Sequence, residues 1–289
     1  MSHVWDSLVL GGVDKPRILI CGSNFCFNPY FNENTDGWTK GTNGTATRVS
    51  DINSIGEYLL NLTFTGSGQS YIEYSYDTSE PILNKKFIAA IRIKSKYAFK
   101  IQLLGASLLN EITVQPSDII NNIFIIAEGT GSGNIIKLKI IGTDNVDIKF
   151  DNLYLTIISD DYIFPQPNES KILFEKNNLG ENQLWNGKIQ QFNFKFLPIF
   201  YCSWNYLSAI YESFRQKISF NQQLFCIPHM DVNWGFFGIW VDDFERKYSF
   251  DRFFGHNSDI SIKGSEFIYE LPSLQSGTGS LYIDDDLIK

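Results

Sequence analysis

The sequence lacks the features that mark several large classes of protein. Its 24 Lys and Arg residues form no run, and its 32 Asp and Glu residues bring the net charge to −8. Nucleic-acid binding depends on clustered cations, so no nucleic-acid partner is expected. No apolar run approaches the roughly 20 residues of a membrane helix, and no charged start precedes an apolar stretch. We therefore expect a soluble chain, made in a cytoplasm, with no membrane insertion.

Residues typical of catalytic and metal centres are also scarce. The 3 histidines, His3, His229 and His256, belong to neither an HExxH motif nor a Cys/His zinc spacing. The glycine-rich stretch "GTGSG" lies between two expected strands, where it fits a hairpin rather than a phosphate loop. Asp242 and Asp243 are adjacent, so a strand would send them to opposite faces instead of placing both across one cleft. The sequence predicts that the protein is not an enzyme.

The chain is poor in cysteine and rich in apolar residues. Its 4 cysteines show no CxxC spacing, and so few in 289 residues do not make a disulfide framework. We expect Cys21, Cys26, Cys202 and Cys226 to be buried thiols. Apolar residues make up 43% of the chain, with 24 Phe among them, which predicts a large folded core. The length favours two domains.

Residues 45–158 consist of short runs that alternate between apolar and polar side chains, such as "SYIEYSYD" and "NIIKLKIIG". Gly, Asn, Asp and Ser separate the runs, and this regular spacing predicts an antiparallel sandwich or barrel. A short strand, "RILICGS", precedes the block within an N-terminal arm at 1–24. The acidic, proline-containing segment "SDDYIFPQPNESK" indicates a linker, which we place at 159–179.

The second block, 180–289, combines strands with one helix. Its first strand, "GKIQQFNFKFLPIF", alternates Phe with polar residues and is expected to be half-buried. Apolar residues then recur three and four apart after the capping residue Ser203, which predicts an amphipathic helix. They are Trp204, Leu207, Tyr211, Phe214 and Ile218. Strand patterns resume afterwards, so the expected fold is mainly β: an antiparallel β-sandwich followed by a β-rich α+β domain.

Three motifs of the first block resemble those of a known family: Asn28-Pro29-x-Phe31, Gly37-Trp38 and Phe150-Asp151-Asn152-Leu153. In their order and separation they resemble the carbohydrate-binding-module β-sandwich family, a jelly roll with galactose-binding-like topology. The resemblance covers about residues 25–158. It implies that the opening segment, around residues 28–31, and the final strand, around residues 150–153, come together. It also implies that the ligand is a glycan.

The same resemblance implies a structural calcium between the opening segment and the final strand. Calcium takes six to eight oxygen ligands. The residues at the corresponding positions are Asn28, Asn32 and Asp151, and Asn32 stands where the family usually has an acid. Calcium is the one cofactor that the sequence suggests.

Sugar binding requires exposed rings that stack on pyranose faces, with polar groups beside them for the hydroxyls. The rings available in the first block are those of Trp38, Tyr71, Tyr74 and Tyr76. Two interpretations stay open. The rings form a platform for a glycan, or Trp38 plugs the end of the core while the tyrosines alternate in and out of a strand.

The order of elements in residues 180–271 resembles the structural domains of bacteriophage tails, the tube and distal-tail family, in which a β-sandwich flanked by a helix assembles into rings. The segments "VDDFERKYSFD" and "DISIKGSEF" follow the helix in that order. Aromatic residues cluster here and indicate either a subunit interface or a core strand with a ring-rich turn. The candidates for the interface are Trp234, Phe236, Phe237, Trp240, Phe253 and Phe254.

Together these features predict a non-enzymatic virion protein of a bacteriophage tail or baseplate, made in the host cytoplasm. Its second domain would join other tail proteins in a homo-oligomeric ring. Its sandwich would face outward, where it could meet host surface glycans. The alternative is a freestanding carbohydrate-binding protein.

Overall fold

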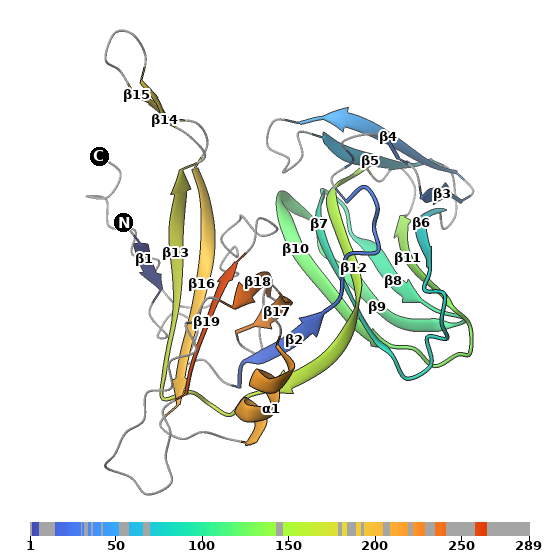
Figure 1. Cartoon of the computed structure of the whole chain (residues 1–289). Helices are drawn as coiled ribbons and strands as arrows, with labels where there is room; N and C mark the ends of the chain where they lie inside the picture. The colour runs from blue at the N-terminus through green and yellow to red at the C-terminus, as the bar shows by residue number, and fades with distance from the viewer. Residues whose placement is uncertain are drawn as a thin grey trace, which may run out of the picture. The chain divides into compact units, whose positions relative to one another are not determined.

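The computed structural model describes residues 2–5, 15–29, 31, 34–35, 37–41, 43–51, 58–65, 70–142, 147–178, 181–183, 189–191, 194–204, 209–218, 222–228, 235–240 and 258–264. The chain divides into two compact units. The sandwich unit is Ile20–Asp160, and the terminal unit joins Met1–Leu19 to Asp161–Lys289. Strands dominate both units, so the expected mainly β fold is confirmed (Figure 1).

The described strands of the sandwich unit form two antiparallel sheets. The β7–β12 sheet has the order β10-β7-β12-β5-β4, with β10 (Ser117–Glu128), β7 (Lys86–Ser95), β12 (Asp147–Ile163), β5 (Tyr58–Phe64) and β4 (Gly44–Ser50). The β6–β11 sheet has the order β3-β6-β11-β8-β9, with β3 (Trp38–Lys40), β6 (Ser70–Asp77), β11 (Ile135–Gly142), β8 (Phe99–Leu104) and β9 (Leu108–Val114). Figure 1 shows the two sheets as separate layers.

Alternation along the strands sends one side of each sheet into a common core. In β6, Ile72 and Tyr74 are buried, whereas Tyr71 and Glu73 stay partly exposed. In β11, every second residue from Ile136 is fully buried in the same way. Leu62, Ile91, Phe150 and other apolar residues of the β7–β12 sheet belong to the same core cluster. The predicted antiparallel sandwich is therefore present.

The terminal unit contains a sheet and a helix. Its described strands have the order β1-β13-β16-β19-β18-β17, with β1 (Ser2–Trp5), β13 (Glu169–Asn178), β16 (Phe194–Trp204), β19 (Ser258–Gly264), β18 (Phe236–Trp240) and β17 (Gln223–Ile227). Strands β13 and β16 form a long ribbon, and a hairpin of β14 (Glu181–Gln183) and β15 (Ile189–Gln191) lies beyond its end (Figure 1). Strand β2 (Arg17–Cys21), like β12, crosses the boundary between the two units.

The segment expected to be a linker, 159–179, is mostly strand. Strand β12 continues to Ile163 and β13 begins at Glu169, so only the short stretch with Pro165 separates them. Asp161, one of the acids that suggested a linker, accepts two hydrogen bonds from the Arg17 guanidinium, at 2.8 and 2.7 Å. Phe164 is also buried. The acids and prolines suggested solvent exposure, but pairing and packing hold this segment in the fold.

The predicted helix is present, but it starts later than expected. Helix α1 spans Ala209–Lys217, and its Phe214 is buried. Ser203 and Trp204 belong to strand β16 instead of capping and beginning the helix. Trp204 is held there because its Nε1 donates to the Pro165 carbonyl at 2.9 Å and its ring lies 5.4 Å from that of Phe164.

Two residues of the predicted assembly interface lie in the core instead. Phe236 and Phe237 are 0% and 1% exposed in β18. The Phe237 ring contacts that of Phe225 edge-on at 4.7 Å. The core-strand interpretation therefore holds for these two residues. Trp234, Phe253, Phe254 and the side chain of Trp240 lie outside the described residues.

All four cysteines are buried free thiols, as the sequence predicts. Burial raises the pKa of Cys26 to about 11, so this thiol stays protonated at neutral pH.

In the part of the chain that the structure describes, no helix is long and apolar enough to cross a membrane.

Candidate functional site on the outer face of the β6–β11 sheet

A row of five polar side chains crosses the outer face of the β6–β11 sheet, one from each strand. The strand registers place them opposite one another in the order Thr39, Glu73, Lys139, Gln102 and Glu111. Their neighbours along the strands, including Ile72, Leu138 and Ile101, point into the core. Because side chains alternate between the two faces of a strand, all five lie on the side away from the core. We call them the polar row.

Hydrogen bonds fix both carboxylates of the polar row. Glu111 accepts from Lys100 Nζ at 2.8 Å and from Gln102 Nε2 at 2.5 Å. These bonds, that of Lys100 first, lower the pKa of Glu111 below its ordinary value. Glu73 accepts from Lys137 Nζ at 2.9 Å. The row thus offers carboxylate acceptors beside ammonium and amide donors.

Tyr71 lies on the same outer face as the polar row. Lys139 Nζ sits 3.8 Å from the centroid of the Tyr71 ring, in a cation–π contact. Gly41 packs against the same ring, because a Cβ at Gly41 would lie 2.7 Å from the ring atoms Cδ1 and Cε1. The Gly41 amide also donates to the Tyr71 carbonyl at 2.9 Å. The ring is therefore held in place, with the lysine ammonium over one of its faces.

Two of the four rings proposed for sugar stacking belong to the core. Tyr74 is 2% exposed, and its hydroxyl donates to the Phe25 carbonyl at 3.1 Å, so its ring is not available to a ligand. Trp38 pairs with Tyr74 across β3 and β6 and is partly buried. Its ring contacts those of Phe31 and Phe150 at 6.2 and 5.1 Å. Trp38 therefore plugs the sandwich core, as the second sequence interpretation has it.

The fourth ring, that of Tyr76, lies beside Phe27, an exposed residue that the sequence does not single out. Tyr76 is partly buried and stacks on Phe25, with centroids 4.4 Å apart and planes 4° apart. Phe27 lies beside Tyr76 at 6.2 Å and is 91% exposed. No feature of the sequence distinguishes Phe27 from the other rings of the opening segment.

The opening segment meets strand β12, as the family resemblance implies. Asn24 Nδ2 donates to the Leu153 carbonyl at 3.1 Å, and Asn24 Oδ1 accepts from the Leu155 amide at 3.0 Å. The backbone adds two bonds, from the Phe25 amide to the Leu155 carbonyl at 2.7 Å and from the Leu153 amide to the Pro29 carbonyl at 3.3 Å. These bonds join the two segments directly.

The two described residues proposed to hold calcium, Asn28 and Asp151, already have other partners. Asp151 is 1% exposed, and its Oδ2 lies 3.1 Å from Nη1 of Arg92, whose positive charge disfavours a metal cation at the same carboxylate. The Asn28 side-chain amide donates to the Asn34 carbonyl at 2.9 Å. Asn32 lies outside the described residues. Within the described ranges, no group of three or more His, Cys, Asp and Glu side chains could hold a metal ion.

No protein-family model matches the chain, and no curated protein is similar to it in sequence. Solved structures do show similarity. One is the enzymatically active domain of tailspike protein 4 of bacteriophage CBA120, at 14% identity and TM-score 0.39, covering 47% of this chain and 21% of that one. Another, the C-terminal family 22 carbohydrate-binding module of Clostridium thermocellum Xyn10B, is 9% identical with TM-score 0.38, covering 47% and 94%.

A third similar structure is TmCBM61 in complex with β-1,4-galactotriose, at 16% identity and TM-score 0.36, covering 46% of this chain and 98% of that one. The similar part spans only 21% of the tailspike chain, and only 27% of a two-module Clostridium thermocellum xylanase chain that also matches.

Proposed function

We propose that the protein is a non-enzymatic glycan-binding protein and that the polar row, with Tyr71 beside it, contacts the sugar. The polar row itself carries the proposal. Sugar hydroxyls both donate and accept hydrogen bonds, and the row presents hydroxyl, carboxylate, ammonium and amide groups on one surface. Four strand spacings of about 4.8 Å make the row roughly 19 Å long, which suits an extended ligand.

The placement of the carboxylates supports a binding role rather than hydrolysis. Glu73 and Glu111 stand on β6 and β9, which are separated by β11 and β8. Three strand spacings put their backbones about 14 Å apart. Glycosidases hold their two carboxyl groups about 5–9.5 Å apart. The lowered pKa of Glu111 also disfavours a general acid, which must hold a proton near neutral pH.

A glycan array probed with the full-length protein tests this function. We expect binding that falls about tenfold in Tyr71→Ala and Gln102→Ala, because each loses a stacking or hydrogen-bonding group. Lys149→Gln is the control, since Lys149 is an exposed residue of the β7–β12 sheet. Mass spectrometry of the bound glycan should show no cleavage products.

Two outcomes would contradict the proposal. Absence of binding to any glycan would remove the sugar function. Binding lost in Phe27→Ser but retained in Tyr71→Ala would move the site from the polar row to the exposed ring beside Tyr76.

We further propose that the protein is a structural component of a bacteriophage tail or baseplate that assembles through its terminal unit. Two observations support this role. Strands β13 and β16 pair over ten successive positions and are extended by the β14–β15 hairpin. Strand β1 ends the described sheet order, and it has no second neighbour among the described strands. An open strand edge is a surface to which another chain can add a strand.

Light scattering of the full-length protein over a concentration series tests the assembly role. A closed oligomer that dissociates when residues 181–191 are deleted would support it. A monomer at every concentration would contradict self-assembly and favour the freestanding carbohydrate-binding protein.

A further inference from the structure

The central part of the candidate site carries one more cation than anion. Its charged side chains are Lys100, Lys137, Lys139, Glu73 and Glu111. Lys100 pairs with Glu111 at 2.8 Å, and Lys137 pairs with Glu73 at 2.9 Å. Lys139 is therefore the cation of this group that contacts no carboxylate among the described residues. This local excess of positive charge contrasts with the net charge of −8 of the whole chain.

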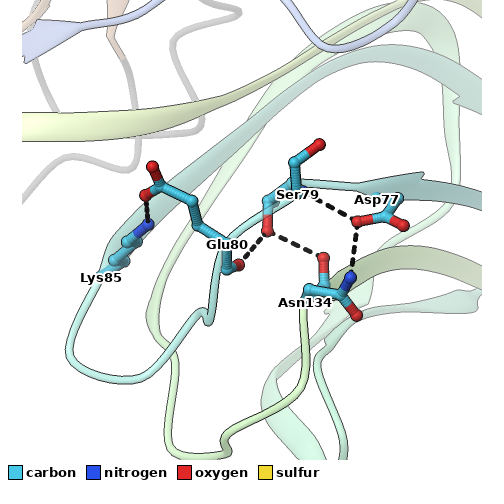
Figure 2. A network of polar contacts seen from close by, with 6 residues as sticks. Asp77, Ser79, Glu80, Lys85 and Asn134 are labelled. Atoms are coloured by element: carbon cyan, nitrogen blue, oxygen red, sulfur yellow. Dashed lines mark hydrogen bonds and ion pairs between the residues drawn. The ribbon is translucent and has the colours of Figure 1, made fainter.

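The nearest further acid along β6 is engaged elsewhere. Asp77 lies four residues beyond Glu73, about 13 Å along the strand. Figure 2 shows its carboxylate turned into a loop network, where Oδ1 accepts from Asn134 Nδ2 and from the Ser79 amide, both at 2.8 Å. In the same network Lys85 pairs with Glu80. Asp77 therefore does not neutralise Lys139.

Lys139 also occupies a position that a ligand on this face must meet. It stands on β11, the middle strand of the sheet, between Glu73 and Gln102 in the polar row. Its ammonium lies over Tyr71, the ring to which the proposed function assigns contact with the sugar. A neutral sugar would have to displace that ammonium from the ring and would give it no counter-charge in return.

We infer that this face selects acidic glycans, with a sugar carboxylate bound by Lys139 and the same sugar packed beside Tyr71. The inference rests on the proposed glycan-binding function. A sugar carboxylate can accept a hydrogen bond from the Lys139 ammonium. This charged hydrogen bond compensates for the lost contact with Tyr71, because it is stronger than a cation–π contact at an exposed site. The paired lysines, Lys100 and Lys137, already have carboxylate partners within the protein. Lys139 is thus the group that distinguishes an acidic sugar from its neutral counterpart.

The experiment uses matched pairs of glycans that differ only in charge. The full-length protein is bound to an array that carries uronate oligosaccharides with their methyl esters and sialylated glycans with their desialylated forms. Sulfated and unsulfated pairs form a separate arm, which shows whether the acid must be a carboxylate. We expect the carboxylate member of a pair to bind about tenfold more tightly than the neutral member. This ratio should fall as salt is raised.

Substitution of the lysine tests its role directly. Lys139→Gln should bring the acidic-to-neutral ratio close to one, and Lys139→Arg should restore it. The matched control, Lys149→Gln, removes one cation from the other sheet of the sandwich and should leave the ratio unchanged. Thermal melting confirms that each variant is folded. The ratio is the decisive readout, because a merely structural role for Lys139 would weaken both members of a pair alike.

Three results would overturn the inference. If neutral glycans bind as tightly as acidic ones, the inference fails while the glycan-binding function stands. If the acidic preference survives in Lys139→Gln, another group selects the acid. If no glycan on the array binds, the proposed function fails and the inference with it.

Discussion

Both sheets of the sandwich hold pairs of opposite charges, but they bury them differently. In the β7–β12 sheet, Arg92 and Asp151 are 5% and 1% exposed. In the β6–β11 sheet, Lys137 and Glu73 are 35% and 18% exposed. Separating a buried pair leaves a charge without water, whereas an exposed pair already competes with water and salt. The first pair should therefore contribute much more to the stability of the fold than the second.

The buried pair also stands where the family resemblance places a metal. Asp151 matches the closing acid of the carbohydrate-binding-module pattern, and its countercharge here is the Arg92 guanidinium. The joining of the opening segment to β12, which calcium would otherwise support, is carried by Asn24 and by backbone hydrogen bonds. Among the described residues, a guanidinium thus faces the carboxylate that the resemblance assigns to calcium, and an amide joins the opening segment to β12.

The largest expected effect comes from breaking the buried pair. Arg92→Met leaves the Asp151 carboxylate buried without its countercharge and should cost about 3–5 kcal/mol of unfolding free energy. Urea denaturation of the full-length protein measures this. The double variant Arg92→Met with Asp151→Leu should recover most of the loss, because replacing both charges by apolar groups is often close to neutral.

Lys94→Met, two residues further along β7, is the matched control for the charge. A single Arg92→Met that costs no more than Lys94→Met would show that the buried pair contributes nothing to the fold. The comparison between the two sheets would then have no energetic basis.

A smaller loss is expected when the tie between the opening segment and β12 is cut. Asn24→Ala removes three hydrogen bonds, from Asn24 Nδ2 to the Leu153 carbonyl and from the amides of Leu155 and Cys26 to Asn24 Oδ1. We expect a cost of about 2 kcal/mol in urea denaturation, since buried partners are left unsatisfied. Asn28→Ala, which removes an exposed bond in the same segment, should cost less. Equal costs for the two variants would mean that Asn24 has no special role.

The sequence could predict the strands of the sandwich because alternation is a local property. The segment "SYIEYSYD" indicates by itself that Ile72 and Tyr74 share one face and Tyr71 and Glu73 the other, as the structure has it. The helix was likewise visible in its apolar spacing. The spacing predicts too early a start, because Trp204 fits both a helical stripe and strand β16.

The candidate site could not be predicted, because it depends on register between strands far apart in the sequence. Nothing local to β11 says that Lys139 lies opposite Glu73 and Gln102, or that its ammonium covers Tyr71. The sequence likewise leaves open whether Trp38 is an exposed ring or part of the core. It lies in the core because β3 pairs with β6 and aligns Trp38 with the buried Tyr74.

The partly exposed Lys137–Glu73 pair of the β6–β11 sheet should matter little for stability. Glu73→Gln removes the partner of Lys137 and should cost between about 0.2 and 1 kcal/mol, because exposed ion pairs gain little over water. Urea denaturation at low and high salt measures this, and the cost should shrink at high salt. A loss as large as that of Arg92→Met would show that the two pairs do not differ in their contribution to stability.

The smallest expected effect is that of metal. The melting temperature of the full-length protein should be the same in excess EDTA and in excess calcium, because Arg92 already neutralises Asp151 and repels a second cation. If calcium did bind, a free calcium concentration 100 times its dissociation constant would stabilise the folded state by about 2.7 kcal/mol, which calorimetry would detect.

Arg92→Met gives the sharper form of the metal test. If the guanidinium alone keeps a cation from the Asp151 carboxylate, calcium should raise the melting temperature of this variant while leaving the wild type unchanged. Stabilisation of the wild type by calcium would instead place a metal at other residues. It would contradict the prediction that the Arg92 guanidinium keeps calcium from Asp151.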